Sequence, residues 1–327
     1  MNKLIKKAFT LIELLVVIAI IGILSGLIVV SMGGMTEKAT IAKAQVFSNS
    51  LRNSLMLDIV SEWKFDGTGK NDGEAADIIY VDDTWGKNDG YFCSVNASNP
   101  HPFPTVKTGN NCISGSCLYF DNIDDNIRTS SSLRYTGGGM TISAWVKIDS
   151  AAANSSYLVS KPWNGNGYYN YYFYWNATNT ISFWIGGDSN NGPVISSPAN
   201  VVKNKWHHIV ATVNSDTASQ SPKAIKLFVN GDSVASGIHT ITTWVPTLGG
   251  ADQLVDLAIG HVYRCDQSVP ERFFHGYMDE VRIYNAAIPT SQIKEQYFAG
   301  LNSLLANKTI NSSEYYSKIQ EFSSIDF

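Results

Sequence analysis

The sequence predicts a mainly β protein with a long N-terminal α-helix and a short helical C-terminal tail. Three observations support this fold class. Residues 14–30 carry no charge, helical periodicity continues to about residue 63, and short aromatic and β-branched runs then alternate with Gly, Asn, Asp, Ser and Thr. That alternation is typical of a many-stranded antiparallel sandwich.

The N-terminal apolar run is long enough to cross a bilayer. As a helix, Phe9–Val30 spans roughly 33 Å at about 1.5 Å per residue. Three lysines precede it, and because basic residues stay on the cytoplasmic side, everything after Met32 is expected outside. A plain anchor does not explain Glu13, since an acidic residue within a membrane segment usually has a partner.

The first residues show a short basic leader, a small residue and then FTLIELLVVIAIIGIL. This pattern resembles the class III signal of type IV prepilins and pseudopilins, in which a prepilin peptidase cuts before the Phe and the new N-terminus is methylated. The resemblance implies cleavage between Ala8 and Phe9, methylation of Phe9, and pairing of Glu13 with the terminal amine of a neighbouring subunit. Ala8 stands where Gly is usual, and Val30 stands where the family commonly has a helix proline.

The same resemblance implies a single-pass protein of the cytoplasmic membrane that becomes part of an extracellular surface filament. Its expected partners are further copies of the chain, the prepilin peptidase and the pilus assembly machinery. A secretory signal peptide or plain anchor is the alternative, but no A-x-A site follows the run. The formal net charge of −4 becomes −7 once the three leader lysines are removed, which argues against nucleic acid as a partner.

The chain is expected to divide into four parts. Residues 1–8 are the leader, and residues 9–62 form the N-terminal helix, with a membrane or filament-core half at 9–32 and an amphipathic half at 36–62. Phe47, Leu51, Leu55 and Ile59 recur every four residues in the second half. Residues 63–288 form the head and 289–327 a helical tail, with helices expected from Thr290 and over 312–322. The tail is expected to clamp the N-terminal helix, to contact a neighbouring subunit, or to fray.

Candidate strands occur throughout the head, and Asn230-Gly231 between two of them predicts a hairpin turn. They are Glu62–Asp66, Cys117–Phe120, Met140–Ile148, Tyr168–Trp175, Thr180–Ile185, Trp206–Val213, Ala224–Val229, Leu254–Ile259 and Gly276–Tyr284.

Several of these segments resemble the laminin-G-like, concanavalin A-like lectin/glucanase superfamily. The matching pieces are WKFDG at 63–67, LYFD at 118–121 with Asp124-Asp125, MTISAWVK at 140–147, WHHIVAT at 206–212, IKLFVNG at 225–231 and GYMDEVRIY at 276–284. Together they cover residues 63–296 and imply a jelly roll of two antiparallel sheets.

Four cysteines suit an extracytoplasmic head, where disulfides persist. Cys112 and Cys117 are the nearest pair and have a glycine turn between them, so we favour that bond, which leaves Cys93 with Cys265. A zinc site is the alternative, but the spacings lack C-x-x-C.

One structural Ca²⁺ is expected where the resemblance places the first and last strands of the sandwich side by side. Asp66, Asp83 and Asp279, with Asn88, would supply oxygen ligands. The alternative is that these side chains cap turns and accept backbone amides.

Catalysis is not expected. The sandwich glucanases carry E-x-D-x-x-E along one strand, whereas no glutamate lies between Glu74 and Glu271 here.

The run 163–175 has aromatic residues at both odd and even positions, so a strand there shows rings on both of its faces. One face can belong to the core, and the other needs to be covered or to bind a ligand. Of the adjacent residues His207 and His208, one side chain is expected to be half-buried and the other to point outward.

Taken together, these observations lead us to expect a filament subunit whose head serves adhesion to a glycan or surface protein. The alternatives are a type II secretion pseudopilin and a membrane-anchored carbohydrate-binding or carbohydrate-processing protein.

Overall fold

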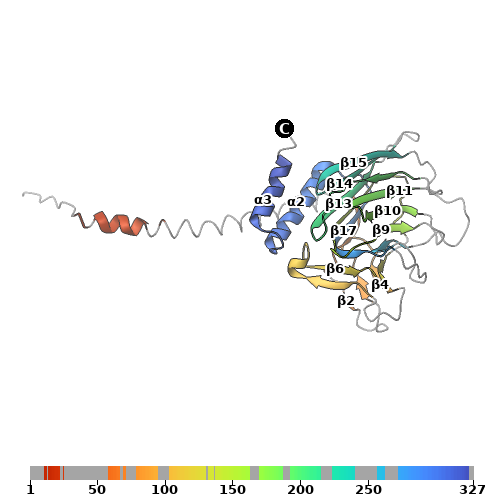
Figure 1. The fold of residues 1–327 in the computed structure, drawn as a ribbon, viewed down its shortest axis with the longest axis horizontal. Helices are drawn as coiled ribbons and strands as arrows, with labels where there is room; N and C mark the ends of the chain where they lie inside the picture. Colours follow the sequence, from red (N-terminus) through yellow and green to blue (C-terminus); the bar gives the residue numbers. More distant parts are fainter. Residues whose placement is uncertain are drawn as a thin grey trace, which may run out of the picture. The chain divides into compact units, whose positions relative to one another are not determined.

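The structure is a computed structural model that describes residues 11–12, 14–22, 25, 58–66, 69–70, 79–94, 103–129, 132–135, 137–162, 169–186, 192–214, 223–239, 256–261 and 272–323. The chain divides into two compact units, Met1–Phe47 and Ser48–Phe327. All described residues of the first unit are helical. The second unit holds the strands and the C-terminal helices (Figure 1).

The described strands of the second unit form two antiparallel sheets. Sheet A contains, in spatial order, β15 (Asp232–His239), β14 (Lys223–Val229), β13 (Trp206–Val213), β8 (Met140–Ile148), β17 (His275–Tyr284), β6 (Ser116–Asp121) and β5 (Thr105–Thr108), and β1 (Ile59–Trp63) also pairs with β17. Sheet B contains β12 (Val194–Ser196), β11 (Thr180–Ile185), β10 (Tyr169–Asn176), β9 (Ser156–Pro162), β16 (Ala258–Ile259), β7 (Asp125–Arg128), β4 (Gly90–Ser94), β3 (Ile79–Val81) and β2 (Gly69–Lys70). The predicted antiparallel sandwich is confirmed.

The local predictions within the sandwich largely hold. Three strands, β8, β11 and β13, have the predicted bounds. The predicted hairpin joins β14 to β15, with φ values of 55° at Asn230 and 85° at Gly231. Asn and Gly tolerate this left-handed region, which explains the turn.

The predicted N-terminal helix is wrong at its C-terminal end. Ile59–Trp63 form β1, in which Trp63 pairs with Val281 of β17 and is fully buried. The four-residue spacing that ends at Ile59 favours a helix locally, but ladder bonds to β17 and burial of Trp63 override that preference. The predicted amphipathic helix from residue 36 to residue 57 lies outside the described residues.

Alternate residues of the strands point inward and form the apolar core between the two sheets. In β10, Tyr171, Phe173 and Trp175 are fully buried in the main cluster, which they share with alternate residues of β11 and β8. This period of two is the reason that the sequence forms strands here.

The two predicted tail helices are present as α2 (Thr290–Ala306) and α3 (Ser312–Ser323). They pack on the outer side of sheet A, where Tyr297 and Leu301 join a second apolar cluster with Trp145 and Trp206. Gly300 allows close packing, because a Cβ there would lie 2.1 Å from a ring carbon of Trp145. The tail therefore packs on its own head rather than fraying.

Candidate functional site

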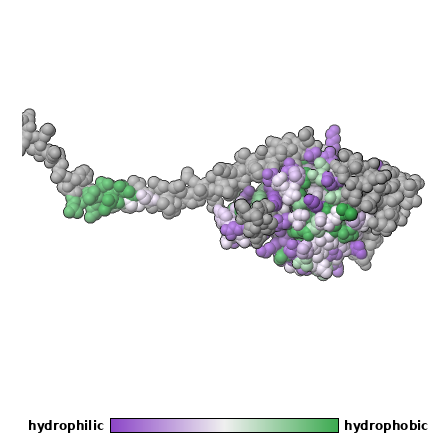
Figure 2. Space-filling view, turned by 90° about the horizontal axis from the view of Figure 1, so that it is seen from above, coloured by the Kyte–Doolittle hydropathy of each residue, from purple (hydrophilic) through white to green (hydrophobic). Residues whose placement is uncertain are grey.

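The residues predicted for processing and assembly, Ala8, Phe9 and Glu13, lie outside the described residues. In the same segment, the described helical residues expose large apolar side chains, with Leu11 at 83% and Ile12 at 72% exposure. They form a hydrophobic surface in Figure 2. Among the described residues, no helix meets the length and hydropathy that a membrane crossing requires.

The favoured disulfide is present and closes a short loop before β6. Cys112 and Cys117 are bonded, with their Cα atoms 5.3 Å apart. Both cysteines are fully buried in the apolar cluster beneath α2. Gly115, at φ +49°, makes the turn between them. The second predicted pair is not tested, because Cys265 and the side chain of Cys93 lie outside the described structure.

Two aspartates that we predicted as metal ligands, Asp66 and Asp279, accept backbone amides of this loop. Asp279 Oδ2 accepts the amides of Ile113 at 2.8 Å and Ser114 at 3.2 Å, and its Oδ1 accepts the amide of Glu280 at 2.8 Å. Asp66 Oδ1 accepts the amide of Ser116 at 2.7 Å. Burial raises the pKa of Asp279, the neighbouring Glu280 adds to the rise, and the three amides oppose it.

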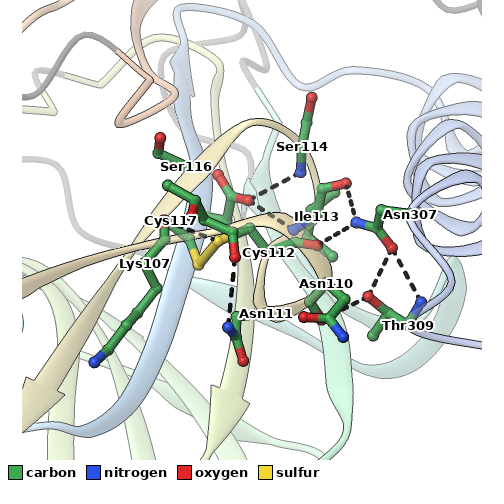
Figure 3. Close-up of a disulfide and its surroundings, with 12 residues drawn as sticks. Lys107, Asn110, Asn111, Cys112, Ile113, Ser114, Ser116, Cys117, Asn307 and Thr309 are labelled. Atoms are coloured by element: carbon green, nitrogen blue, oxygen red, sulfur yellow. Dashed lines mark hydrogen bonds between the residues drawn. A yellow bond between two sulfur atoms is a disulfide. The ribbon is translucent and has the colours of Figure 1, made fainter.

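The tail fastens to the other side of the same loop. Asn307 Nδ2 donates to the carbonyl of Cys112 at 2.7 Å, and Thr309 Oγ1 donates to the carbonyl of Asn110 at 2.7 Å (Figure 3). The loop is therefore clamped between β17 and the residues that follow α2. Sequence reasoning missed Asn307 and Thr309, because their partners are backbone carbonyls almost 200 positions away in the chain.

The remaining two predicted ligands organise a different loop. Asp83 Oδ1 accepts the amides of Glu62, Trp85 and Gly86, and its Oδ2 accepts the amide of Asn88. The carbonyl of Asn88 accepts the indole N–H of Trp63 at 3.0 Å. This loop therefore fixes β1 against the sandwich.

The predicted calcium set is corrected by this arrangement. Asp66 and Asp279 serve the disulfide loop, whereas Asp83 and Asn88 serve the loop beside β1. These oxygens accept backbone or indole N–H groups, which is the turn-capping alternative. Each of these aspartates has nearby backbone amides of its own as partners.

The structure instead brings together three other carboxylates at the turn between β6 and β7. Within the described part of the chain, Asp121, Asp124 and Asp125 form a group that could hold a metal ion, with one oxygen of each within 4.8 Å of the others. Asp124 is fully buried and Asp125 is 1% exposed. Burial raises the pKa of Asp125 to about 8, and Asp121 and Asp124 add to the rise.

Another pair of acidic residues is neutralised by an arginine. Arg282 Nε donates to Glu62 Oε1 at 2.9 Å, and its guanidinium also contacts Glu280. Burial alone would raise the pKa of Glu62, but Arg282, with Lys64 and Thr84, lowers it to about 2. The pair between Arg282 and Glu62 ties β1 to β17.

Aromatic side chains gather on the side of sheet B that faces away from the core. Tyr172 stacks on Trp184 with ring centres 5.2 Å apart and an 8° interplanar angle, and Tyr157 lies edge-on to Tyr172 and Tyr174. Tyr172 and Tyr174 are partly exposed. The prediction that β10 shows rings on both faces is confirmed, because Tyr171, Phe173 and Trp175 fill the core.

Comparison with known proteins gives two family matches. Residues 5–29 match the prokaryotic N-terminal methylation motif, and residues 121–294 match the family described as the concanavalin A-like lectin/glucanases superfamily. No curated protein matches the chain in sequence.

Solved structures with similar folds include three kinds of protein. Domain 4 of AbnA, a GH43 extracellular arabinanase from Geobacillus stearothermophilus in complex with arabinotriose, is 17% identical with a TM-score of 0.47, covering 72% of this chain and 97% of that one. The botulinum neurotoxin serotype D binding domain is 13% identical with a TM-score of 0.49, covering 77% and 53%. Trypanosoma rangeli sialidase in complex with the inhibitor DANA is 13% identical with a TM-score of 0.45, covering 73% and 32%.

The superfamily match spans more than half of the chain, including most of both sheets and the start of α2. The methylation motif covers the apolar segment at the other end. The chain therefore belongs to the concanavalin A-like lectin/glucanases superfamily and joins such a domain to a prokaryotic N-terminal methylation motif.

Proposed function

We propose that this protein is a type IV pilin-like subunit that polymerises through its N-terminal helix and carries its lectin-like head on a surface filament. The observation that supports this most is the row of exposed apolar side chains that begins at Leu11, inside the methylation motif. In water such a surface is unfavourable, so it needs lipid before assembly and neighbouring helices afterwards. Prepilin peptidase would remove residues 1–8 and leave a methylated Phe9.

Glu13 would then guide assembly. It becomes the fifth residue of the processed chain, within reach of the terminal amine of a neighbouring copy. An ion pair of this kind is strongest where water is excluded, as it is between packed apolar helices. The pairing explains an acidic residue at a position where a charge is otherwise costly.

The proposed role of the head is adhesion rather than catalysis. The partly exposed rings of Tyr172 and Tyr174 lie on the outer face of β10, where Tyr172 stacks on the buried ring of Trp184. Rings of this kind stack on the apolar faces of sugars and also bind protein surfaces. The carboxylates of Glu62 and Glu280 are paired with Arg282, which favours a structural role for them over general acid catalysis.

Terminal sequencing and filament imaging test the proposal together. Protein purified from cells should begin at methylated Phe9, and Glu13→Ala should leave the chain in the membrane while abolishing filaments. Glu13→Asp, which keeps the charge, is the matched control and should retain some assembly. A mature terminus between Ser25 and Met35, or abundant normal filaments from Glu13→Ala, would contradict the proposal.

Adhesion is tested separately from assembly. Filaments that carry Tyr174→Ala should form normally and bind fewer host cells or arrayed glycans. Val194→Ala is the control, because this side chain is also exposed on a strand of sheet B but is not aromatic. Equal binding by the two variants would argue against the aromatic surface.

A further inference from the structure

The turn between β6 and β7 holds carboxylates in an arrangement that the proposed function does not use. Here the chain passes from β6 of sheet A to β7 of sheet B. The amide of Asn122 donates to the carbonyl of Phe274 at 3.0 Å, which also fastens the turn to the start of β17. A ligand at this turn would therefore connect both sheets.

The three acidic side chains of the turn converge. Asp121, Asp124 and Asp125 each offer an oxygen within 4.8 Å of the others. Two of their oxygens already have backbone partners, because Asp125 Oδ2 accepts the amide of Asp121 at 2.7 Å and Asp121 Oδ1 accepts the amide of Ile123 at 2.8 Å. The other oxygen of each residue, Asp125 Oδ1 and Asp121 Oδ2, accepts neither of these amides.

A second observation concerns one oxygen of this group. Asp125 is 1% exposed, and among the described residues no donor reaches its Oδ1. A buried carboxylate oxygen without a donor is costly, and nearby carboxylates increase that cost. The positions of Asp279 and Asp83 differ, since both of their oxygens accept amides.

We propose that Asp121, Asp124 and Asp125 form a Ca²⁺ site in which Asp125 Oδ1 is a direct ligand. Calcium takes six to eight hard oxygen ligands in flexible geometry, so carboxylates, backbone carbonyls and water can share the coordination. Magnesium fits less well, because it demands near-ideal octahedral geometry and retains its own water. The site is independent of the filament proposal and differs from the calcium site predicted from the sequence.

The ion would stabilise the corner of the sandwich. Because calcium binds the folded turn and not the unfolded chain, it raises stability by mass action. The stability of the junction between the two sheets would then depend on the calcium concentration around the head.

The experiment uses the full chain purified in detergent. Calorimetric titration with Ca²⁺ should show one ion per chain, and saturating Ca²⁺ should raise the unfolding midpoint by roughly 4–8 °C relative to a chelator. Asp125→Asn keeps an oxygen for the amide of Asp121 but should lose most of the heat and of the midpoint shift. Asp124→Asn serves as a second variant if Asp125→Asn proves poorly folded by circular dichroism.

Asp82→Asn and Asp66→Asn are the matched controls, because both replace exposed aspartates of the same head. They should bind calcium as the unaltered chain does, and Mg²⁺ at the same concentration should produce a smaller shift. Absence of calcium binding, or full binding by both Asp124→Asn and Asp125→Asn, would overturn the proposal and leave the carboxyl groups sharing a proton.

Discussion

The two ends of β6 handle buried carboxylates in opposite ways. At its start, fully buried Asp279 accepts three amides and thereby holds the disulfide loop. At its end, Asp125 is equally buried, but in the described structure only one of its oxygens accepts an amide. Backbone amides therefore satisfy both oxygens of Asp279. In the described structure Asp125 Oδ1 has no such donor, so a proton or a cation can occupy the position beside it.

The largest expected change in stability follows from removing Asp279, the carboxylate that accepts three backbone amides. Asp279→Ala should lower the free energy of unfolding by about 3–5 kcal/mol, because three buried amides lose their acceptor. Urea unfolding of the full chain in detergent, followed by tryptophan fluorescence, measures this change.

The control for Asp279 lies on the same loop. Asp66→Ala removes an exposed side chain that accepts the amide of Ser116, and should cost no more than about 1 kcal/mol. Equal losses in the two variants would show that burial of the amides does not determine the cost.

The disulfide should contribute less than Asp279 to the same loop. Replacing Cys112 and Cys117 together by serine opens a short loop, for which chain entropy predicts a loss of about 2 kcal/mol. Because Asn307 donates to the carbonyl of Cys112, amides at the C-terminal end of α2 should also exchange faster with deuterium.

The matched control changes a residue of the same loop and retains the disulfide. Ser114→Ala alters a loop side chain without changing the bond, and it should leave exchange in α2 unchanged. Unaltered exchange in the double serine variant would mean that the tail docks independently of the disulfide.

Much of the fold could be predicted because it depends on local pattern. Alternation places Phe173 and Trp175 in the core, Asn230-Gly231 specifies the hairpin, and the spacing of Cys112 and Cys117 selects their bond. Helical spacing failed at Ile59, because the competing partner, β17, lies more than 200 residues away.

The site could be predicted only in part, because it depends on irregular backbone. In a regular strand Asp279 and Glu280 would lie on opposite faces, but β17 changes register between Asp279 and Arg282, and Glu280 has φ +51°. This bulge, together with the loop that Asp279 holds, has no strong signal in the sequence.

The burial of His207 and His208 also depends on a feature that local sequence does not show, which is the packing of the C-terminal tail. We expected one ring to point outward, yet both are buried, and His208 lies fully enclosed beside Trp145 and Tyr297. Burial lowers the pKa of His208 to about 3, with a smaller contribution from Arg282. Alternation correctly separates the two faces, but it does not reveal that α2 covers the outer one.

The smallest expected effect, counted per pH unit, concerns Asp125, of which only one carboxylate oxygen accepts an amide in the described structure. Burial and the neighbouring acidic residues raise the pKa of Asp125 to about 8, above its unfolded value of about 4. Stability from a raised pKa is fully present below the unfolded value and is lost as pH rises through the folded value. In calcium-free buffer, the advantage of the unaltered chain over Asp125→Asn should therefore fall by about 1.4 kcal/mol per pH unit between pH 5 and pH 7. Unfolding curves of both proteins across this range measure it, with Asp82→Asn as the control. Parallel curves for all three proteins would show that Asp125 is ionised in the fold and that the two ends of β6 are alike.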